Sequence, residues 1–314
     1  MADDGGNWER QVVEKLAFEA IREQRRGRRW GIFFKMLAFA YVAFLIVLAM
    51  DLRGDTDAMS GKHTALVDLT GVIEAKGDAS ADRISGALQN AFKDKNTVGV
   101  ILRVNSPGGS PVQAGIIYDE IRRLRGLYPN IPVYAVVEDI CASGGYYVAA
   151  ATDRIYVDKA SIVGSIGVIM NGWGFTGIMN KLGVERRTIT SGDNKAFLDP
   201  FAPADDKQKQ FAQAMIGEIH QQFIDVVKKG RGKRLKEAPE LFSGLVWTGA
   251  KSVELGLADA LGSVDFVARE VIKAEAIVDY TQKENIAERF AKRLGAGAAS
   301  AISGVATRES FGVR

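Results

Sequence analysis

A serine followed by two glycines, Ser143-Gly144-Gly145, comes shortly after an apolar run at residues 132–137 that is typical of a buried strand. The small residues 148–151 predict a short helix behind it. In such a strand–turn–helix unit, the hydroxyl lies on the turn, and the free N–H groups of the helix N-terminus can stabilise an oxyanion. The pattern suits a nucleophile, although Ser and Gly also dominate ordinary turns.

A second glycine turn offers the other half of a candidate oxyanion site. Residues 105–109, Asn-Ser-Pro-Gly-Gly, connect a predicted strand at 98–104 to a predicted helix at 111–128. If the two strands are neighbours in a parallel sheet, the N–H groups of Gly109 and Gly144 converge on one oxygen. Each such donor is worth about 3 kcal/mol of transition-state stabilisation. A plain turn between strand and helix is the alternative.

A nucleophilic serine needs a base, and the two histidines are poor candidates. His63 lies beside a polar stalk, and His220 lies on the apolar side of a predicted long helix, where packing is its usual role. Lysine can replace histidine if burial keeps its amine neutral. With 41 Lys and Arg residues, composition does not select one.

The single cysteine, Cys141, is a second candidate nucleophile, but no histidine lies near it in the sequence. No Cys/His pair has the spacing of zinc ligands, so neither a metal nor another cofactor is expected. The net charge of +3 is too small to indicate a nucleic-acid partner, and 47% apolar residues exclude wholesale disorder.

Strands and helices alternate between residues 64 and 274. This alternation predicts an α/β fold with a mainly parallel sheet, in which ligands bind at the carboxyl ends of the strands. The predicted strands are 64–73, 98–104, 132–137 and 184–189, and residues 154–157 form a short apolar run. The predicted helices are 80–93, 111–128, 148–151, 177–182, 205–229, 248–255 and 264–274.

Residues 30–50 carry only Lys35 as a charge and follow the basic segment 25–29. At 1.5 Å per residue they reach about 32 Å, the thickness of a bilayer core. The positive flank predicts a single membrane anchor with a cytoplasmic N-terminus. A cleaved signal peptide is disfavoured, since the basic segment begins late and the apolar run is long; a buried core helix is the other alternative.

The expected organisation has five parts. They are a basic cytoplasmic N-terminus at 1–29, a transmembrane helix at 30–50, a stalk at 51–62, the soluble domain at 63–284, and a flexible Gly/Ala/Ser-rich tail at 285–314 that could reach a peptide groove.

Four motifs in order, at residues 105–109, 142–147, 164–168 and 191–195, resemble the signal peptide peptidase A family, peptidase family S49. These are membrane-bound bacterial serine proteases. The resemblance covers about residues 64–274 and also matches the N-terminal anchor. It implies the Clp protease/crotonase fold, a mainly parallel sheet of repeated ββα/βαβ units.

The resemblance also assigns site residues. It implies a Ser-Lys dyad with Ser143 as nucleophile and Lys195 as general base, and Ser165 as the residue that orients the lysine. Gly109 and Gly144 form the oxyanion hole. Residues 196–200, which follow the lysine, are more apolar than is usual in the family. Activity should fall below neutral pH, because a protonated amine cannot take the serine proton.

By resemblance, the substrates are signal-peptide remnants or other hydrophobic membrane-associated peptides, with small or aliphatic residues before the cut. Because the chain has one copy of a domain that longer members have twice, a ring-shaped homo-oligomer with sites between protomers is expected. Its place would be the bacterial cytoplasmic membrane, with the catalytic domain on the extracytoplasmic side. Two alternatives are a crotonase-like acyl-CoA enzyme and a non-catalytic membrane scaffold.

Overall fold

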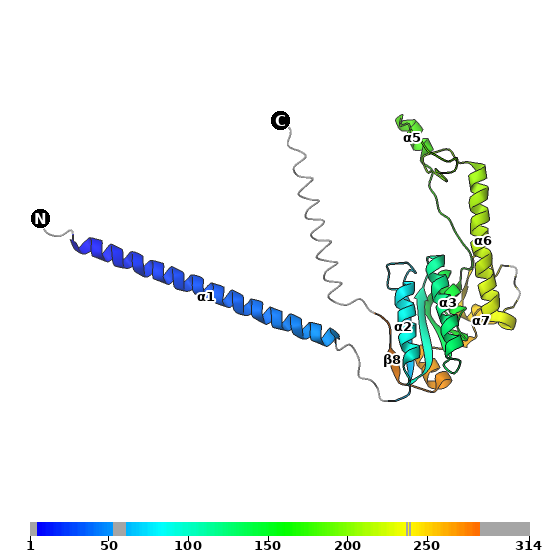
Figure 1. The fold of residues 1–314 in the computed structure, drawn as a ribbon, viewed down its shortest axis with the longest axis horizontal. Coiled ribbons are helices and arrows are strands. Elements are labelled where there is room, and N and C mark those ends of the chain that lie inside the picture. Colours follow the sequence, from blue (N-terminus) through cyan, green and yellow to red (C-terminus); the bar gives the residue numbers. More distant parts are fainter. Residues whose placement is uncertain (1–4, 53–60, 237, 239, 283–314) are drawn as a thin grey trace. The chain divides into compact units, whose positions relative to one another are not determined.

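A computed structural model of the chain describes residues 5–52, 61–236, 238 and 240–282 (Figure 1). The chain divides into two compact units, Met59–Lys283 and a second one made of Met1–Ala58 with Glu284–Arg314. The expected tail at 285–314 and most of the expected stalk lie outside the described residues.

The helix α1, Gly5–Leu52, is 48 residues long and continues through the basic segment 25–29. It starts well before the apolar run, because residues 8–29 are rich in strong helix formers and contain no proline. Its segment Val12–Ile46 is long and apolar enough to cross a membrane, by length and composition. The described side chains of this segment are exposed.

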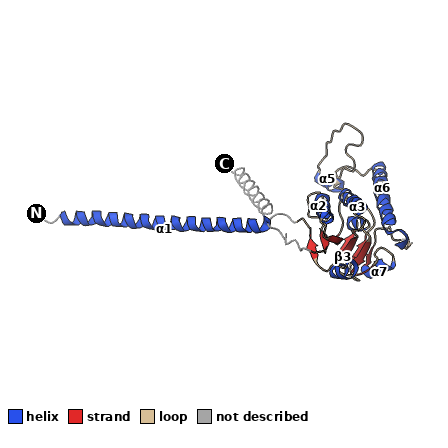
Figure 2. Ribbon diagram, turned by 60° about the horizontal axis from the view of Figure 1, so that its bottom comes forward, coloured by secondary structure: helices blue, strands red, loops and turns tan. Residues whose placement is uncertain are grey.

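In the described residues of Met59–Lys283, one eight-stranded sheet forms the centre (Figure 2). Its order is β6-β5-β3-β2-β1-β8, with β4 paired to β3 and β7 paired to β4. Every pairing is parallel except β5 with β6, so the predicted mainly parallel α/β fold is confirmed. The strands are β1 His63–Thr70, β2 Thr97–Ser106, β3 Val133–Ala142, β4 Arg154–Val157, β5 Ile162–Gly164, β6 Val246–Thr248, β7 Ala260–Leu261 and β8 Ile277–Asp279.

Helices cover both faces of the sheet. Successive residues of a strand point to opposite faces, so neighbouring residues join different buried cores. On one face, Val67 and Leu102 join a large core with α2 and α3, whereas Leu66 and Ile101 join a smaller core beneath the turns at 264–272. The helices are α2 Ala81–Lys93, α3 Pro111–Leu127, α4 Gly144–Ala149, α5 Thr176–Leu182, α6 Asp206–Arg231, α7 Gly249–Glu254 and α8 Val264–Phe266, which continues as a π-helical turn Val267–Ile272.

Three expectations about local structure are corrected. The predicted strand at 184–189 is wrong: residues 184–190 have no regular structure, and Ile189 is 99% exposed. Its alternating pattern has no neighbouring strand to pair with. Strand β3 continues beyond the apolar run to Ala142, and α4 begins directly after Ser143 rather than at residue 148.

Residues 170–205, named the arm here, leave the sheet after β5 and return through α6. Figure 1 draws α5 beyond the end of α6, away from the strands. The arm exposes large apolar side chains, which are Met170, Trp173, Ile178, Leu182, Val184, Ile189, Leu198 and Phe201. It contributes nothing to the two buried cores.

Candidate active site

Ser143 occupies the turn between β3 and α4, in a backbone conformation that is unusual for a residue with a side chain. Its φ is 50° and its ψ is −123°. The turn is held by the Ser143 N–H, which donates to Gly164 O at 2.9 Å, and by the Tyr147 N–H, which donates to Ser143 O at 3.0 Å. Non-glycine residues with positive φ are strained and concentrate at functional sites.

The glycine turn after β2 touches the serine turn, as the adjacent pairing of β2 with β3 requires. Gly108 and Gly109 have φ of 98° and 148°. A Cβ on Gly108 would lie 2.6 Å from Gly144 N, and one on Gly109 would overlap the Ile73 carbonyl oxygen. A side chain on Gly108 would force the two turns apart, and one on Gly109 would displace the loop that contains Ile73, so this packing depends on glycine at both positions.

The N–H groups of Gly109 and Gly144 lie close to each other at this junction. A Cβ built on Gly144 would be 3.3 Å from Gly109 N. Within the described part of the chain, neither N–H donates a backbone hydrogen bond, whereas those of Ile73 and Ser110 do. Two free amides beside a serine hydroxyl are the arrangement that stabilises the oxyanion of a tetrahedral intermediate.

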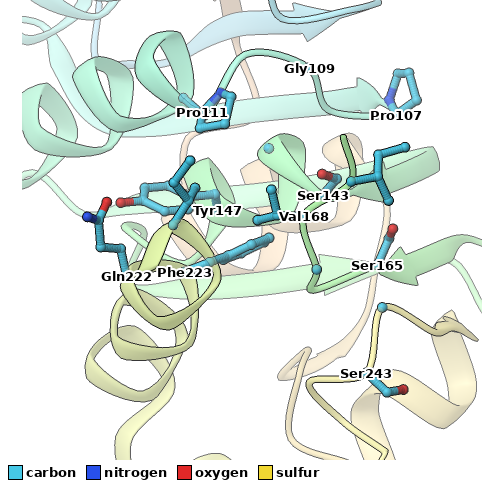
Figure 3. Close-up of a pocket in the computed structure, with 16 residues that line it drawn as sticks. Pro107, Gly109, Pro111, Ser143, Tyr147, Ser165, Val168, Gln222, Phe223 and Ser243 are labelled. Atoms are coloured by element: carbon cyan, nitrogen blue, oxygen red, sulfur yellow. The ribbon is translucent and has the colours of Figure 1, made fainter. Parts of the chain in front are cut away.

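Four of the five predicted site residues line one cavity of about 480 Å³: Ser143, Gly109, Gly144 and Ser165 (Figure 3). The rest of the lining is mostly apolar and consists of Pro107, Pro111, Ala114, Tyr147, Gly167, Val168, Ile169, Ile219, Gln222, Phe223, Ser243 and Gly244. The Tyr147 and Phe223 rings, with centroids 5.2 Å apart, form its aromatic wall.

Ser165 follows β5 and also has positive φ, 51°. Its N–H donates to Leu245 O at 2.8 Å. The Gly164 backbone packs against the Trp247 ring, so close that an added Cβ would lie 3.1 Å from it. The residue is thereby fixed against β6, and its side chain lies across the cavity from the glycine turn (Figure 3).

Lys195 is not in this cavity. It lies on the arm, between α5 and α6, with an exposed side chain, and its N–H donates to Gly192 O at 3.1 Å. Within one chain, therefore, the described residues do not bring the predicted base to the predicted nucleophile, and the amine is not desolvated.

The other candidate nucleophile and base are placed where they cannot take those roles. Cys141 is fully buried, and burial raises the pKa of its thiol, which suppresses the reactive thiolate. His63 is buried at the start of β1, 3.0 Å from the Tyr280 hydroxyl. His220 contacts Ile166 O at 3.1 Å, and neither histidine lines the cavity. Among the described residues, no group of three His, Cys, Asp or Glu residues could hold a metal.

Sequence reasoning missed the far side of the cavity. Ile219, Gln222 and Phe223 come from α6, and Ser243 and Gly244 come from the loop before β6. The predicted helix at 205–229 has an apolar side, but nothing in its sequence shows that part of this side forms a cavity wall. Only the packing of α6 against α4 reveals that wall.

Comparison with known proteins agrees with this architecture. The family model of Peptidase family S49 matches residues 127–278. The chain is 30% identical over 233 residues to a putative signal peptide peptidase SppA of Enterococcus faecium, which covers 72% of this chain and 67% of that protein. It is also 30% identical over 266 residues to a putative protease of Methanocaldococcus jannaschii, covering 80% and 85%.

A third relative is a longer protein. Over 196 residues, the chain is 45% identical to a protein of Brucella melitensis named Na(+)/H(+) antiporter NhaA. The match covers 62% of this chain and 26% of that protein, so the chain spans about a quarter of this relative's length. Together with the parallel α/β fold and the serine turn, these matches show that the chain belongs to the signal peptide peptidase A family, peptidase family S49.

Proposed function

We propose that this protein is a membrane-anchored serine endopeptidase that uses a Ser-Lys dyad. The observation that carries the proposal is the junction at which the strained Ser143 turn meets two unpaired glycine amides over one cavity. Its family relatives include proteins named as proteases. The apolar segment of α1 is the proposed anchor, with the basic flank in the cytoplasm and the catalytic unit on the extracytoplasmic side of a bacterial membrane.

The proposed reaction follows acyl transfer. Neutral Lys195 takes the Ser143 proton as Oγ attacks the peptide carbonyl carbon, and the oxyanion is held by the Gly109 and Gly144 N–H groups. The C–N bond then breaks, and protonated Lys195 gives its proton to the leaving amine. Water hydrolyses the ester in a second attack with the same groups. Ser165 is proposed to orient the lysine.

The lysine is proposed to come from a neighbouring copy of the chain. Two observations support this: Lys195 lies outside its own chain's cavity, and the arm that carries it exposes apolar side chains such as Trp173, 80% exposed. Large exposed apolar patches mark interaction sites. Packing of the arm on the next copy would bury these side chains and desolvate the amine, and repetition of this heterologous contact closes a ring.

The cavity favours hydrophobic peptides. Its wall of Tyr147 and Phe223 and its volume of about 480 Å³ suit a small or aliphatic side chain before the cut. An enzyme anchored by α1 would meet signal-peptide remnants and other hydrophobic segments in or near the bilayer. We therefore propose such peptides as the substrate class.

The test is peptide cleavage by the full chain purified in detergent. Cleavage of a fluorogenic apolar peptide should fall at least about 1,000-fold in both Ser143→Ala and Lys195→Ala. A fluorophosphonate should label the wild-type protein at Ser143. An acyl-CoA enzyme of the same fold needs no nucleophilic serine, so absence of labelling would favour that alternative. Undiminished cleavage by Ser143→Ala would refute the proposal, and a cellular function that survives this substitution would favour a scaffold.

A further inference from the structure

Ser106, the last residue of β2, has a hydroxyl buried in the backbone of the glycine turn. Its exposed fraction is 0%. The hydroxyl donates to Gly71 O at 2.6 Å and accepts a hydrogen bond from Gly108 N–H at 3.2 Å. The Ser106 side chain thus joins the loop after β1 to the loop after β2. Ser106 itself does not line the cavity.

Backbone hydrogen bonds complete this junction on both sides of the hydroxyl. The Gly71 N–H donates to Asn105 O at 2.9 Å, and the Ser110 N–H donates to Ile73 O at 2.8 Å. Between them, the Ile73 N–H donates to Gly108 O at 2.8 Å. Gly108 is therefore held twice, at its N–H by Ser106 and at its carbonyl by Ile73.

The carbonyl of Gly108 and the N–H of Gly109 belong to the same peptide group. In a trans peptide these two groups point in opposite directions, and the described chain has no cis peptide bond. Because the carbonyl faces Ile73, the Gly109 N–H must point away from Ile73, on the side where Gly109 meets Gly144 and the cavity.

This orientation needs a restraint, because two successive glycines can rotate their shared peptide at little cost. A flipped peptide would present the Gly108 carbonyl oxygen to the developing negative charge. The Ile73 N–H restrains this peptide directly through the Gly108 carbonyl. The Ser106 hydroxyl restrains it indirectly, because it ties the preceding Pro107–Gly108 peptide to Gly71, in the same loop as Ile73. Gly145 adds contact from the nucleophile side, since a Cβ there would lie 3.0 Å from Ser106 O.

We infer that Ser106 is a positioning residue for the oxyanion hole: its hydroxyl joins the Gly71 carbonyl to the Pro107–Gly108 peptide, and so keeps Ile73 in place to hold the next peptide with the Gly109 N–H directed at the reacting carbonyl. The inference rests on the proposed peptidase function. It assigns Ser106 no contact with substrate. Its effect should appear in transition-state stabilisation and not in substrate binding.

The experiment compares Ser106→Ala with wild type, both as full chains in detergent. We expect kcat for the fluorogenic peptide to fall about 10- to 100-fold with KM changed less than about 3-fold, since loss of an oxyanion donor itself costs about 100- to 1,000-fold. Affinity for a peptide boronic acid, whose tetrahedral adduct mimics the intermediate, should fall by the same factor as kcat/KM. Affinity for the cleaved product should not change.

Two matched controls test whether the effect is specific to the Ser106 hydroxyl or follows from replacing any serine in this part of the fold. Ser85 has a buried hydroxyl without a hydrogen-bond partner among the described residues. Ser85→Ala should therefore change neither kcat nor the affinity for the boronic acid. Ser110 caps α3 by accepting from Gln113 N–H, so Ser110→Ala should lower the melting temperature while boronate and product affinities keep their ratio.

Ser106→Thr keeps the hydroxyl and covers the case in which Ser106→Ala does not fold. It should retain the boronate-to-product ratio of wild type, measured per folded chain. Two results would overturn the inference alone, provided that wild type still cleaves through Ser143. One is an unchanged ratio of boronate to product affinity in Ser106→Ala, and the other is an equal fall of this ratio in Ser106→Thr and Ser106→Ala. A wild type without Ser143-dependent cleavage would overturn the proposed function and this inference together.

Discussion

The edge of the sheet around Ser143 and the arm at residues 170–205 differ in how their shape is fixed. At the sheet edge, the glycine and serine turns are held by backbone hydrogen bonds, and contacts leave no room for a Cβ on Gly108 or Gly109. The arm keeps its apolar side chains in solvent, with Ile189 99% exposed. A single chain thus completes the nucleophile and oxyanion part of the proposed site and leaves the lysine part without a packed environment.

If the proposed ring forms, this contrast assigns the dependence on assembly to the lysine half of the site. Parts fixed within one chain should survive dilution to a monomer, whereas parts carried by the arm should not.

The largest expected effect is rescue by mixing. Ser143→Ala and Lys195→Ala should each be inactive alone, but coassembled in equal amounts they should regain about a quarter of wild-type activity, because one site in four combines an intact serine with an intact lysine from its neighbour. Peptide cleavage after mixing in detergent and dilution measures this. Activity that stays at the level of the separate variants would place both residues of the dyad in one chain.

Next in size is the loss of a buried cation from the sheet unit. Arg231 is 2% exposed and contacts Asp259 at 2.8 Å. Arg231→Met should lower the free energy of unfolding by about 3–5 kcal/mol, because it removes the buried partner of the Asp259 carboxylate and leaves it only the partly exposed Arg234 guanidinium as a cation. Urea unfolding followed by circular dichroism measures the change.

The arm offers a matched pair for this substitution. Arg187 contacts Glu185 at 2.9 Å, but these two side chains are 82% and 71% exposed. Arg187→Met should cost only about 0–1 kcal/mol. Equal losses in the two variants would contradict the view that the arm adds little to the stability of the single chain.

A charge on the exposed apolar surface of the arm should act on assembly. Trp173→Glu is expected to lower activity about 100-fold by preventing contact between copies, while the unfolding free energy changes by less than about 0.5 kcal/mol, as is usual for surface sites. Light scattering and cleavage measured on the same sample test this. Lys181→Glu, on exposed polar surface of the same arm, is the control and should leave the assembly intact.

The smallest expected effect is on acid stability. Burial would raise the pKa of Asp259, but the hydrogen bond and charge of Arg231, with help from Arg234, outweigh burial and hold the pKa below its ordinary value. A carboxylate with a lowered folded-state pKa stabilises the fold above its unfolded pKa of about 3.9, and this contribution is lost as pH falls through the folded-state value. Unfolding free energies should therefore be flat near pH 6 and decline below about pH 4.

Asp259→Asn removes the titrating group and should flatten this decline. A slope that is identical in wild type and Asp259→Asn would assign acid lability to other carboxylates.

The sequence was informative where chemistry and local pattern coincide. The apolar runs at 98–104 and 132–137 predicted strands of a parallel sheet. Their adjacency was only a condition in the sequence, and the pairing of β2 with β3 meets it and brings the two glycine turns together. The pattern at 184–189 was misleading, because alternation of apolar residues predicts a strand only where another strand is within reach. That neighbour is absent from the arm as described.

Other features have no signal in the sequence. Nothing in the segment Gly71–Ile73 predicts that it forms the support for the glycine turn, since its residues act through backbone groups. The wall contributed by Phe223 depends on how α6 crosses α4. In the proposed function the place of Lys195 relative to a serine depends on a neighbouring copy, and no residue pattern in the sequence encodes that contact.

The absence of room at Gly108 has a practical consequence. The smallest possible side chain, a methyl group, would displace the Gly144 amide, whereas the aromatic wall of Tyr147 and Phe223 is not among the atoms nearest to it. A Gly108→Ala chain is thus a design for a substrate trap: it should still bind peptides at the membrane, fail to turn them over, and so retain its physiological targets for identification by mass spectrometry.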